Sequence, residues 1–95
     1  MNPEMLKRLR KMQAELEKKQ KEFNNKEFTI EKQGVKIVAS GNKKLISITI
    51  DEMLIDPDDK DLIEDLIVVA WNELIDEIDE AEEELAPAMP NGLPF

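Results

Sequence analysis

Apolar residues in the first quarter of the chain recur at helical spacing. Asn2 and Pro3 suit the start of a helix, because Asn caps free N–H groups and Pro at the first helical position gives up no hydrogen bond. A heptad-like apolar stripe follows, with Lys19 at its one polar position: Met5, Leu9, Met12, Leu16 and Phe23. The pattern predicts a helix over residues 3–23.

Between residues 27 and 50 the apolar residues alternate with polar ones, which is the period of a β-strand. Gly34 and the pair Gly41-Asn42 divide this region into three short runs rich in β-branched residues. Runs of this kind, separated by glycine turns, predict a three-stranded antiparallel meander. One face of that sheet is expected to be apolar and to need a cover; it carries Phe28, Ile30, Val35, Ile37, Ala39, Ile46, Ile48 and Ile50.

A second helix is expected from Asp56 to about residue 86. Asp56 and the acids after Pro57 favour a helix N-terminus, and Pro87 stops the helix. Residues 87–95 hold three Pro and one Gly, so they are expected to form a flexible tail beyond a single domain of residues 1–86. An apolar stripe on this helix, expected to pack on the sheet and then on the first helix, consists of Ile63, Ile67, Ala70, Leu74, Ile78, Ala81 and Leu85.

Part of this second helix is apolar on nearly every side. A helix of that kind must be buried on every side, and a 95-residue monomer with two helices and three strands has too little material to bury it. The expected fold is therefore an α+β homodimer with the order α-β-β-β-α. Its interface is expected to include Leu62, Leu66, Val69, Trp71 and Ile75.

The composition excludes most catalytic chemistry. The chain has no His, no Cys and no Tyr, so it lacks the commonest general base, thiolate metal ligands and Ser-His or Cys-His nucleophile pairs. We expect no enzyme, no cofactor, no metal and no small-molecule substrate. No apolar run is long enough to span a bilayer and the charged N-terminus does not resemble a signal peptide, which predicts a cytoplasmic protein without a membrane partner.

Charge is divided unequally along the chain. Residues 1–50 carry twelve Lys or Arg and six Glu, whereas residues 51–95 carry one Lys and sixteen Asp or Glu. The cations opposite the apolar stripe of the first helix, with no acid in the same arc, are Lys7, Arg10, Lys11, Lys18 and Lys21. Such a face can neutralise phosphates without recognising a base sequence. The alternative is an ordinary solvated face, paired with the acidic second helix.

Two other features have ordinary structural interpretations. The acidic run that starts at Asp56 looks like a calcium loop, but Lys60, Asp61 and Ile67 stand where that loop needs an oxygen ligand, Gly and Glu. A capping turn is the favoured interpretation. Trp71 offers a surface on which a base can stack, but its place in an apolar helical run favours a packed core or interface residue.

Several strings resemble those of the YbaB/EbfC family of nucleoid-associated proteins. Residues 50–81, IDEMLIDPDDKDLIEDLIVVAWNELIDEIDEA, are similar to the family's "ID…L" segment, acidic turn and "LEDLI.AA.NDA" motif. The strings MLKRLRKMQAELEK and GLPF resemble the family's first helix and C-terminal end. The chain departs from the family in having only Gln33-Gly34 between its first strands and no Lys in residues 61–95.

The resemblance implies a nucleoid-associated protein of the cytoplasm that binds duplex DNA as a homodimer, with little sequence preference and an effect on gene expression or nucleoid organisation. In the family, helices that project from the dimer are held to form the DNA-binding surface. Two alternatives stay open at this point. One is a chaperone-like or adaptor module that binds protein, since prefoldin subunits also join two helices through β-hairpins. The other is an acidic decoy that occupies the DNA site of another protein.

Overall fold

The fold has the predicted order of elements. In the computed structural model, which describes residues 2–85, α1 (Pro3–Asn25) is followed by β1 (Glu27–Lys32), β2 (Val35–Ser40) and β3 (Leu45–Ile50). Two 3-10 turns, η1 (Glu52–Leu54) and η2 (Pro57–Asp59), then lead into α2 (Lys60–Leu85). The α+β class and the three-stranded antiparallel meander between two long helices are therefore confirmed. The tail expected over residues 87–95 lies outside the described residues.

Local signals explain where α1 begins and ends. The Asn2 side chain accepts a hydrogen bond from the Glu4 N–H at 2.9 Å, and Pro3 occupies the first helical position. The helix ends at Asn25, two residues beyond the expected end, where Lys26 adopts an extended conformation and donates its N–H to the Phe23 carbonyl. The chain then enters β1 directly, so α1 and the sheet are joined without a long loop.

The sheet has the order β1-β2-β3, which makes β2 its central strand. The β1–β2 turn consists of Gln33 and Gly34, with φ of 48° and 97°. Positive φ at both positions is what a two-residue hairpin turn with the right-handed twist of the strands requires, and it favours Gly at the second position. Ile37 pairs with Ile30 on one side and with Ile48 on the other, so these side chains share one face of the sheet.

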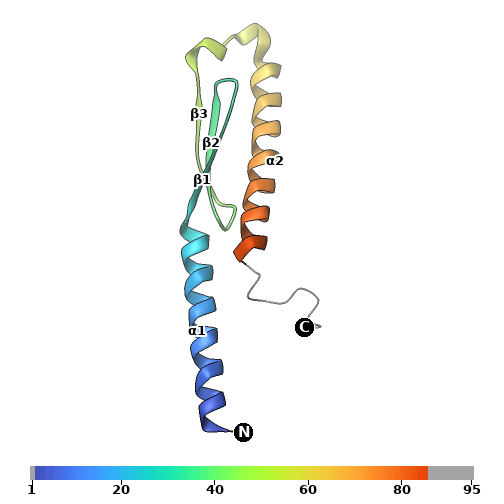
Figure 1. The fold of residues 1–95 in the computed structure, drawn as a ribbon. Coiled ribbons are helices and arrows are strands. Elements are labelled where there is room, and N and C mark those ends of the chain that lie inside the picture. Colours follow the sequence, from blue (N-terminus) through green and yellow to red (C-terminus); the bar gives the residue numbers. More distant parts are fainter. Residues whose placement is uncertain (1, 86–95) are drawn as a thin grey trace.

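The core forms where α2 packs on β1 and β2 (Figure 1). Ala70, Leu74 and Ile78 on α2 are fully buried, as the expected stripe required. They meet the apolar face of the sheet, whose buried members are Ile30, Val35, Ile37 and Ala39. The helix does not extend over β3, where Ile46 is 49% exposed and Ile48 is 40% exposed.

The expected start of α2 at Asp56 was wrong by four residues. Asp51 and Asp56 each accept a hydrogen bond from the backbone N–H two residues on, at 2.9 Å, and each caps a 3-10 turn instead of the long helix. Capping was the correct role for Asp56, but the helix itself begins at Lys60. A short capped turn offers the same acid-rich sequence as a helix start, so the sequence did not separate the two.

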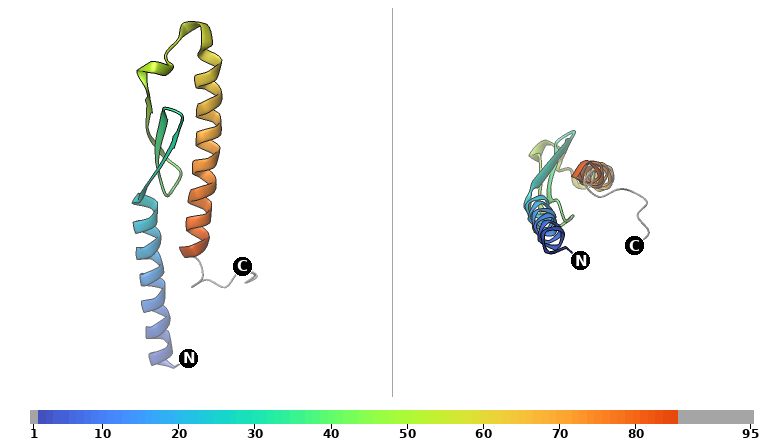
Figure 2. Two further views of the ribbon diagram at one scale, coloured as in Figure 1. Left: turned by 45° about the horizontal axis from the view of Figure 1, so that its top comes forward. Right: turned by 60° about the horizontal axis from the view of Figure 1, so that its bottom comes forward.

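The molecule is elongated, with principal extents of 70 × 23 × 15 Å. α2 lies beside the sheet, whereas α1 continues away from it and runs on past the end of α2 (Figures 1 and 2). Within residues 2–85, no helix combines the length and the apolar character that a membrane span requires.

Candidate nucleic-acid interface

α1 stands apart from the rest of the molecule, and we call it the arm and the segment from β1 to α2 the body. Phe23, near the end of the arm, is the residue of α1 that is buried, and Leu16 is half-buried. Residues 2–15 are all exposed. Because the arm passes beyond the end of α2, its first half is accessible to a large partner from most directions (Figure 2).

The five predicted DNA-binding residues are gathered on one side of the arm. Around the helix axis they occupy an arc of about 100°, roughly opposite the apolar stripe that ends at Phe23. Phe23 is buried against the body, so the cationic arc faces away from the body. The arc extends for about 21 Å along the helix at 1.5 Å per residue. Its members, all exposed, are Lys7, Arg10, Lys11, Lys18 and Lys21, and we call them the cationic face.

The cationic face is not neutralised within residues 2–85. The two ion pairs in that part of the chain lie in the body, where Lys32 Nζ is 2.8 Å from Glu73 and Lys43 Nζ is 2.5 Å from Asp79. Within residues 2–85, the ion pairs of the acidic helix α2 are therefore with the sheet and its turn, not with the cations of the arm. The alternative was that acids of the second helix neutralise the cations of the first. Among the described residues, no ion pair joins the two helices.

Charge is separated in space as well as along the chain. The arm carries seven Lys or Arg and four Glu, a net charge of +3, while α2 carries one Lys and eleven acids, a net charge of −10. From Leu16, beside the end of α2, to Lys7 the arm rises about 14 Å. The Debye length at physiological salt is about 8 Å, so the outer cations are largely screened from the acids of α2.

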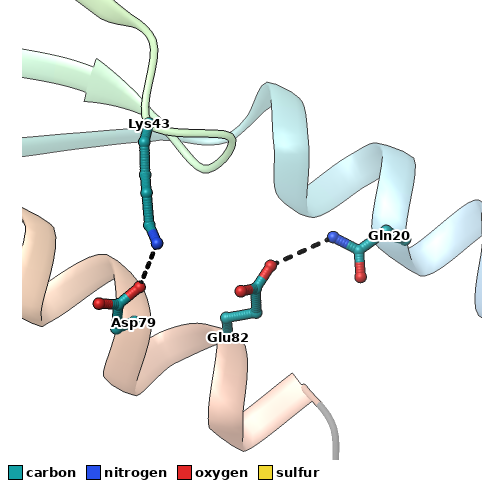
Figure 3. A network of polar contacts seen from close by, with 4 residues as sticks. All are labelled: Gln20, Lys43, Asp79 and Glu82. Carbon is teal, nitrogen blue, oxygen red and sulfur yellow. Dashed lines mark hydrogen bonds and ion pairs between the residues drawn. The ribbon is translucent and has the colours of Figure 1, made fainter. Parts of the chain in front are cut away.

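A polar network holds the base of the arm beside the body (Figure 3). Gln20 on the arm donates to Glu82 on α2 at 3.4 Å and to Asn24 at 2.9 Å. Next to it, Lys43 in the β2–β3 turn binds Asp79. The hydrogen bond to Asp79 and the charges of Asp79 and Glu82 raise the pKa of Lys43 above its usual value. These contacts are exposed, so each contributes little to stability, and the one from Gln20 to Glu82 joins the arm to the body.

Gly41 lets the same turn approach the arm closely. Its N–H donates to the Lys26 carbonyl at 2.9 Å. A Cβ at position 41 would lie 1.9 Å from the Phe23 carbonyl oxygen, which is backbone and cannot move aside. Glycine is therefore required where the arm joins the sheet. The phenyl rings of Phe23 and Phe28, with centroids 5.6 Å apart, pack at the same junction.

The residues expected at a dimer interface lie on two flanks of α2, not on one face. At 100° per residue the two groups are about 120–180° apart around the helix axis. Leu62 and Val69 are exposed and Leu66 is half-buried on one flank, while Trp71 and Ile75 are half-buried on the other. Trp71 also packs against the core, as expected of a packed residue. Whether a second subunit covers these five side chains stays a prediction.

The ion pairs show which strand each flank of α2 follows. Glu73, on the flank of Val69, binds Lys32 at the end of β1. Asp79, on the flank of Ile75, binds Lys43 beside β3. The flank with Trp71 and Ile75 is thus turned toward β3.

Sequence reasoning identified the apolar face of β3 but not that it stays uncovered. A helix with its side chains is about 10–12 Å across, and neighbouring strands are about 4.8 Å apart, so one helix covers about two strands of a sheet. A three-stranded sheet with one helix on its apolar face must therefore leave one strand bare. The strand left bare is β3, with Leu45, Ile46 and Ile48 exposed.

Comparison with known proteins identifies the family. Residues 1–93 match the YbaB/EbfC DNA-binding family. A nucleoid-associated protein of Mycoplasmopsis pulmonis is 52% identical over 93 residues, covering 97% of this chain and 93% of the relative. Another, of Streptococcus thermophilus, is 36% identical and covers 96% and 94% of the two chains.

A solved structure supports the same fold. The crystal structure of an uncharacterized protein from Helicobacter pylori matches with a TM-score of 0.75 and 22% sequence identity, covering 94% of this chain and 97% of the other. The family match favours DNA binding over a chaperone-like module or an acidic decoy. It also agrees with the prediction that the chain is not an enzyme. The chain belongs to the YbaB/EbfC family of nucleoid-associated, non-enzymatic DNA-binding proteins.

Proposed function

We propose that this protein binds duplex DNA as a homodimer with little sequence preference, through the cationic face of both arms. The observation that carries the proposal is a set of five exposed cations, unpaired within residues 2–85, on a helix that projects from the body. Family membership supplies the class of ligand. The position of the cationic face supports the proposed way of holding that ligand.

The cationic face suits the phosphate backbone and not the bases. It extends for about 21 Å, which is the length of about six base pairs at 3.4 Å each. Four of its five members are lysines, whose flexible side chains act as point charges, and Arg10 is the one residue with the fork suited to a guanine edge. Contacts to phosphate fix the position of a protein without specifying a sequence, which gives weak sequence preference.

The acidic body restricts how DNA approaches. The chain as a whole carries a net charge of −9, and α2 by itself carries eleven acids and one Lys, a net charge of −10. DNA is therefore repelled from the outer side of α2 and attracted to the arms alone. Affinity near physiological salt is expected to be low for one dimer and to improve where many dimers coat one duplex.

A second copy of the chain is the proposed cover for the bare apolar surface. Leu45–Ile50 is an edge strand of six residues without a charge, and exposed edges of that kind are rarely left unpaired in soluble proteins. The flank of α2 beside it carries Trp71 and Ile75. We infer that β3, with Leu45, Ile46 and Ile48, belongs to the dimer interface together with the predicted residues of α2.

Sedimentation equilibrium at micromolar concentration tests the dimer. The chain has a mass of 10.9 kDa, so a dimer has about twice that mass. A single species at the monomer mass over the whole concentration range would rule out the dimer. If a monomer still bound DNA, the part of the proposal that concerns the arm would stand and the part that concerns the dimer would not.

An electrophoretic mobility shift over a salt series tests DNA binding. If a dimer makes about six phosphate contacts, affinity should fall on the order of a thousandfold between 50 and 200 mM salt. Duplexes of unrelated sequence should give similar affinities at each salt concentration. Absence of a shift at about 20 mM salt, where screening is weakest, would defeat the proposal.

The proposed location follows from the proposed ligand. A protein that coats duplex DNA is expected on the nucleoid, in the cytoplasm. The relatives are named nucleoid-associated proteins. Cross-linking followed by sequencing should recover this protein along the chromosome with shallow, broad enrichment. Recovery only from the DNA-free fraction would contradict the proposed location.

A further inference from the structure

An open apolar groove lies where the end of α2 meets the arm. It has a volume of about 330 Å³, and its lining includes Leu16 of the arm and Leu85 of α2. Gln13, Gln20 and Glu82 stand around it. Beyond Leu16 the groove opens onto the apolar stripe of the arm, which nothing within residues 2–85 covers.

That uncovered stripe is too apolar to be left in water without cost. Met12 is 56% exposed, Leu9 is 46% exposed and Met5 is 57% exposed, and all three lie in line with Leu16 on one side of α1. The cationic face lies on the other side of the helix, so an occupant of the stripe leaves the cations free.

The chain itself supplies a suitable occupant at the rim of the groove. Leu85 is the last described residue and also lines the groove, so residues 86–95 begin directly beside it. Residues 85–95 are the longest run of the sequence without a charged side chain, in a chain that is 37% charged. Their larger apolar members are Met89, Leu93 and Phe95.

The length of this segment fits the stripe. Ten residues in a proline-rich extended conformation span about 31 Å. The arm from Leu16 to Met5 rises about 17 Å, so the segment reaches along the whole stripe with residues to spare. Three prolines in residues 86–95 reduce the conformational entropy lost on docking, and the tether makes docking intramolecular.

We propose that residues 86–95 dock in the groove between the arm and the end of α2 and lie along Leu16, Met12 and Leu9 of the same chain. Helices of fewer than about 12–15 residues are marginal in water without tertiary contacts, and the outer half of the arm is such a piece. Docking therefore orders the arm before DNA arrives. This last consequence rests on the proposed DNA binding, whereas the docking itself does not.

Paramagnetic broadening tests the docking in the absence of DNA. The chain has no Cys, so a nitroxide attached to a Gly92→Cys variant is the only label. The amide signals of Leu9, Met12 and Leu16 in an isotope-labelled sample should lose most of their intensity, while that of Val68, on the outer side of α2, should not. Unchanged signals along the arm would overturn the proposal.

A mixed sample distinguishes the same chain from a second copy. Isotope-labelled chains without the nitroxide are combined with unlabelled chains that carry it. Docking within one chain predicts that the broadening of the arm signals disappears in this mixture. Broadening that persists would mean that the segment binds the partner's arm, which contradicts the proposal.

Hydrogen exchange supplies a control on the side chains responsible. Changing Met89, Leu93 and Phe95 together to Ser should raise the exchange rates of amides in residues 9–16 by about tenfold or more, because each large apolar side chain contributes at least about tenfold to an equilibrium constant. An Asn91→Ser variant is the matched control and should leave the rates unchanged. Unaltered exchange in the triple variant would show that something else covers the stripe.

Discussion

The arm and the body of this protein differ in both packing and charge. The body holds the core, with Ile37, Leu74 and Ile78 fully buried, and it carries the negative charge. The arm carries the cationic face and has one buried residue, Phe23. Under the proposed function, an acidic protein binds a polyanion through charges that lie away from its folded core. Changes to the exposed side of the arm should therefore alter binding but not folding, and changes in the core should do the reverse.

The largest expected difference is between equivalent truncations in the two regions. Leu74→Ala in the body should lower the free energy of unfolding by about 2–5 kcal/mol, because Leu74 is fully buried and its removal leaves a cavity. Met5→Ala in the arm should cost less than about 0.5 kcal/mol, because Met5 is 57% exposed. Urea unfolding measures both. Equal losses would mean that the outer arm is packed as tightly as the body.

A charge on β3 tests whether the body needs a second copy. Ile48→Lys should weaken dimerisation by about 2 kcal/mol or more, about thirtyfold in Kd, because it places a cation in the proposed apolar interface. Thr49→Lys adds the same charge on the opposite face of the same strand and is the matched control. Sedimentation equilibrium of both variants gives the comparison. If Ile48→Lys is as dimeric as Thr49→Lys, β3 does not lie in the interface.

Gly41 tests the junction between the two regions. Gly41→Ala should destabilise the protein by about 1–3 kcal/mol, because its Cβ would overlap the Phe23 carbonyl unless the arm moves away. Thermal unfolding measures the loss, and Lys44→Ala, in the same β2–β3 connection and with an exposed side chain, is the control. A Gly41→Ala variant as stable as the control would mean that the arm is not held against the turn as described.

The smallest effect is expected at Lys43, which joins the β2–β3 turn to α2. Asp79 raises the pKa of Lys43 above 10.5, so the contact stabilises the fold below the unfolded-state value and is lost as the pH rises through the folded-state value. Asp79→Asn should return the pKa of Lys43 toward 10.5, as followed by the NMR signals of the lysine side chain. Because the pair is exposed, stability near pH 7 should scarcely change. A pKa that does not fall in the variant would remove Asp79 as the cause of the shift.

The sequence was sufficient for the order of elements and for the core, since those depend on local periodicity. The alternation around Ile37 and the helical stripe through Leu74 each specify one apolar face, and the structure packs those two faces together. The start of α2 was missed because Asp56 caps a 3-10 turn with the same residues that begin a helix. Exposure of Ile48 was also missed, because coverage depends on the width of a sheet relative to a helix and not on the pattern within a strand.

For the candidate site too, the sequence predicts the features that depend on residue spacing but not those that depend on tertiary packing. That Lys7, Arg10 and Lys11 share one face of a helix follows from spacing alone. Their freedom from ion pairs within residues 2–85 depends on where α2 ends and which residues its acids meet, such as Glu73 with Lys32. No local pattern contains that information. Trp71 and Val69 were grouped as one interface because both are apolar, although they lie on different flanks of α2.

Two triple variants of equal charge test whether the arm, and not the body, binds DNA. One changes Lys7, Lys11 and Lys18 on the arm to Ala. The other changes the exposed body residues Lys36, Lys44 and Lys60 to Ala. Both lower the charge of each chain by three, and both are expected to fold and dimerise like the wild type.

Affinity for one duplex is then measured across a salt series for the wild type and both variants. The arm variant should lose most of its affinity for every sequence at low salt. Its slope of log affinity against log salt should become shallower, since each lost phosphate contact lowers the slope by about 0.9. The body variant should keep a slope close to that of the wild type. Equal losses in the two variants, or a larger loss in the body variant, would mean that the arm is not the DNA-binding surface.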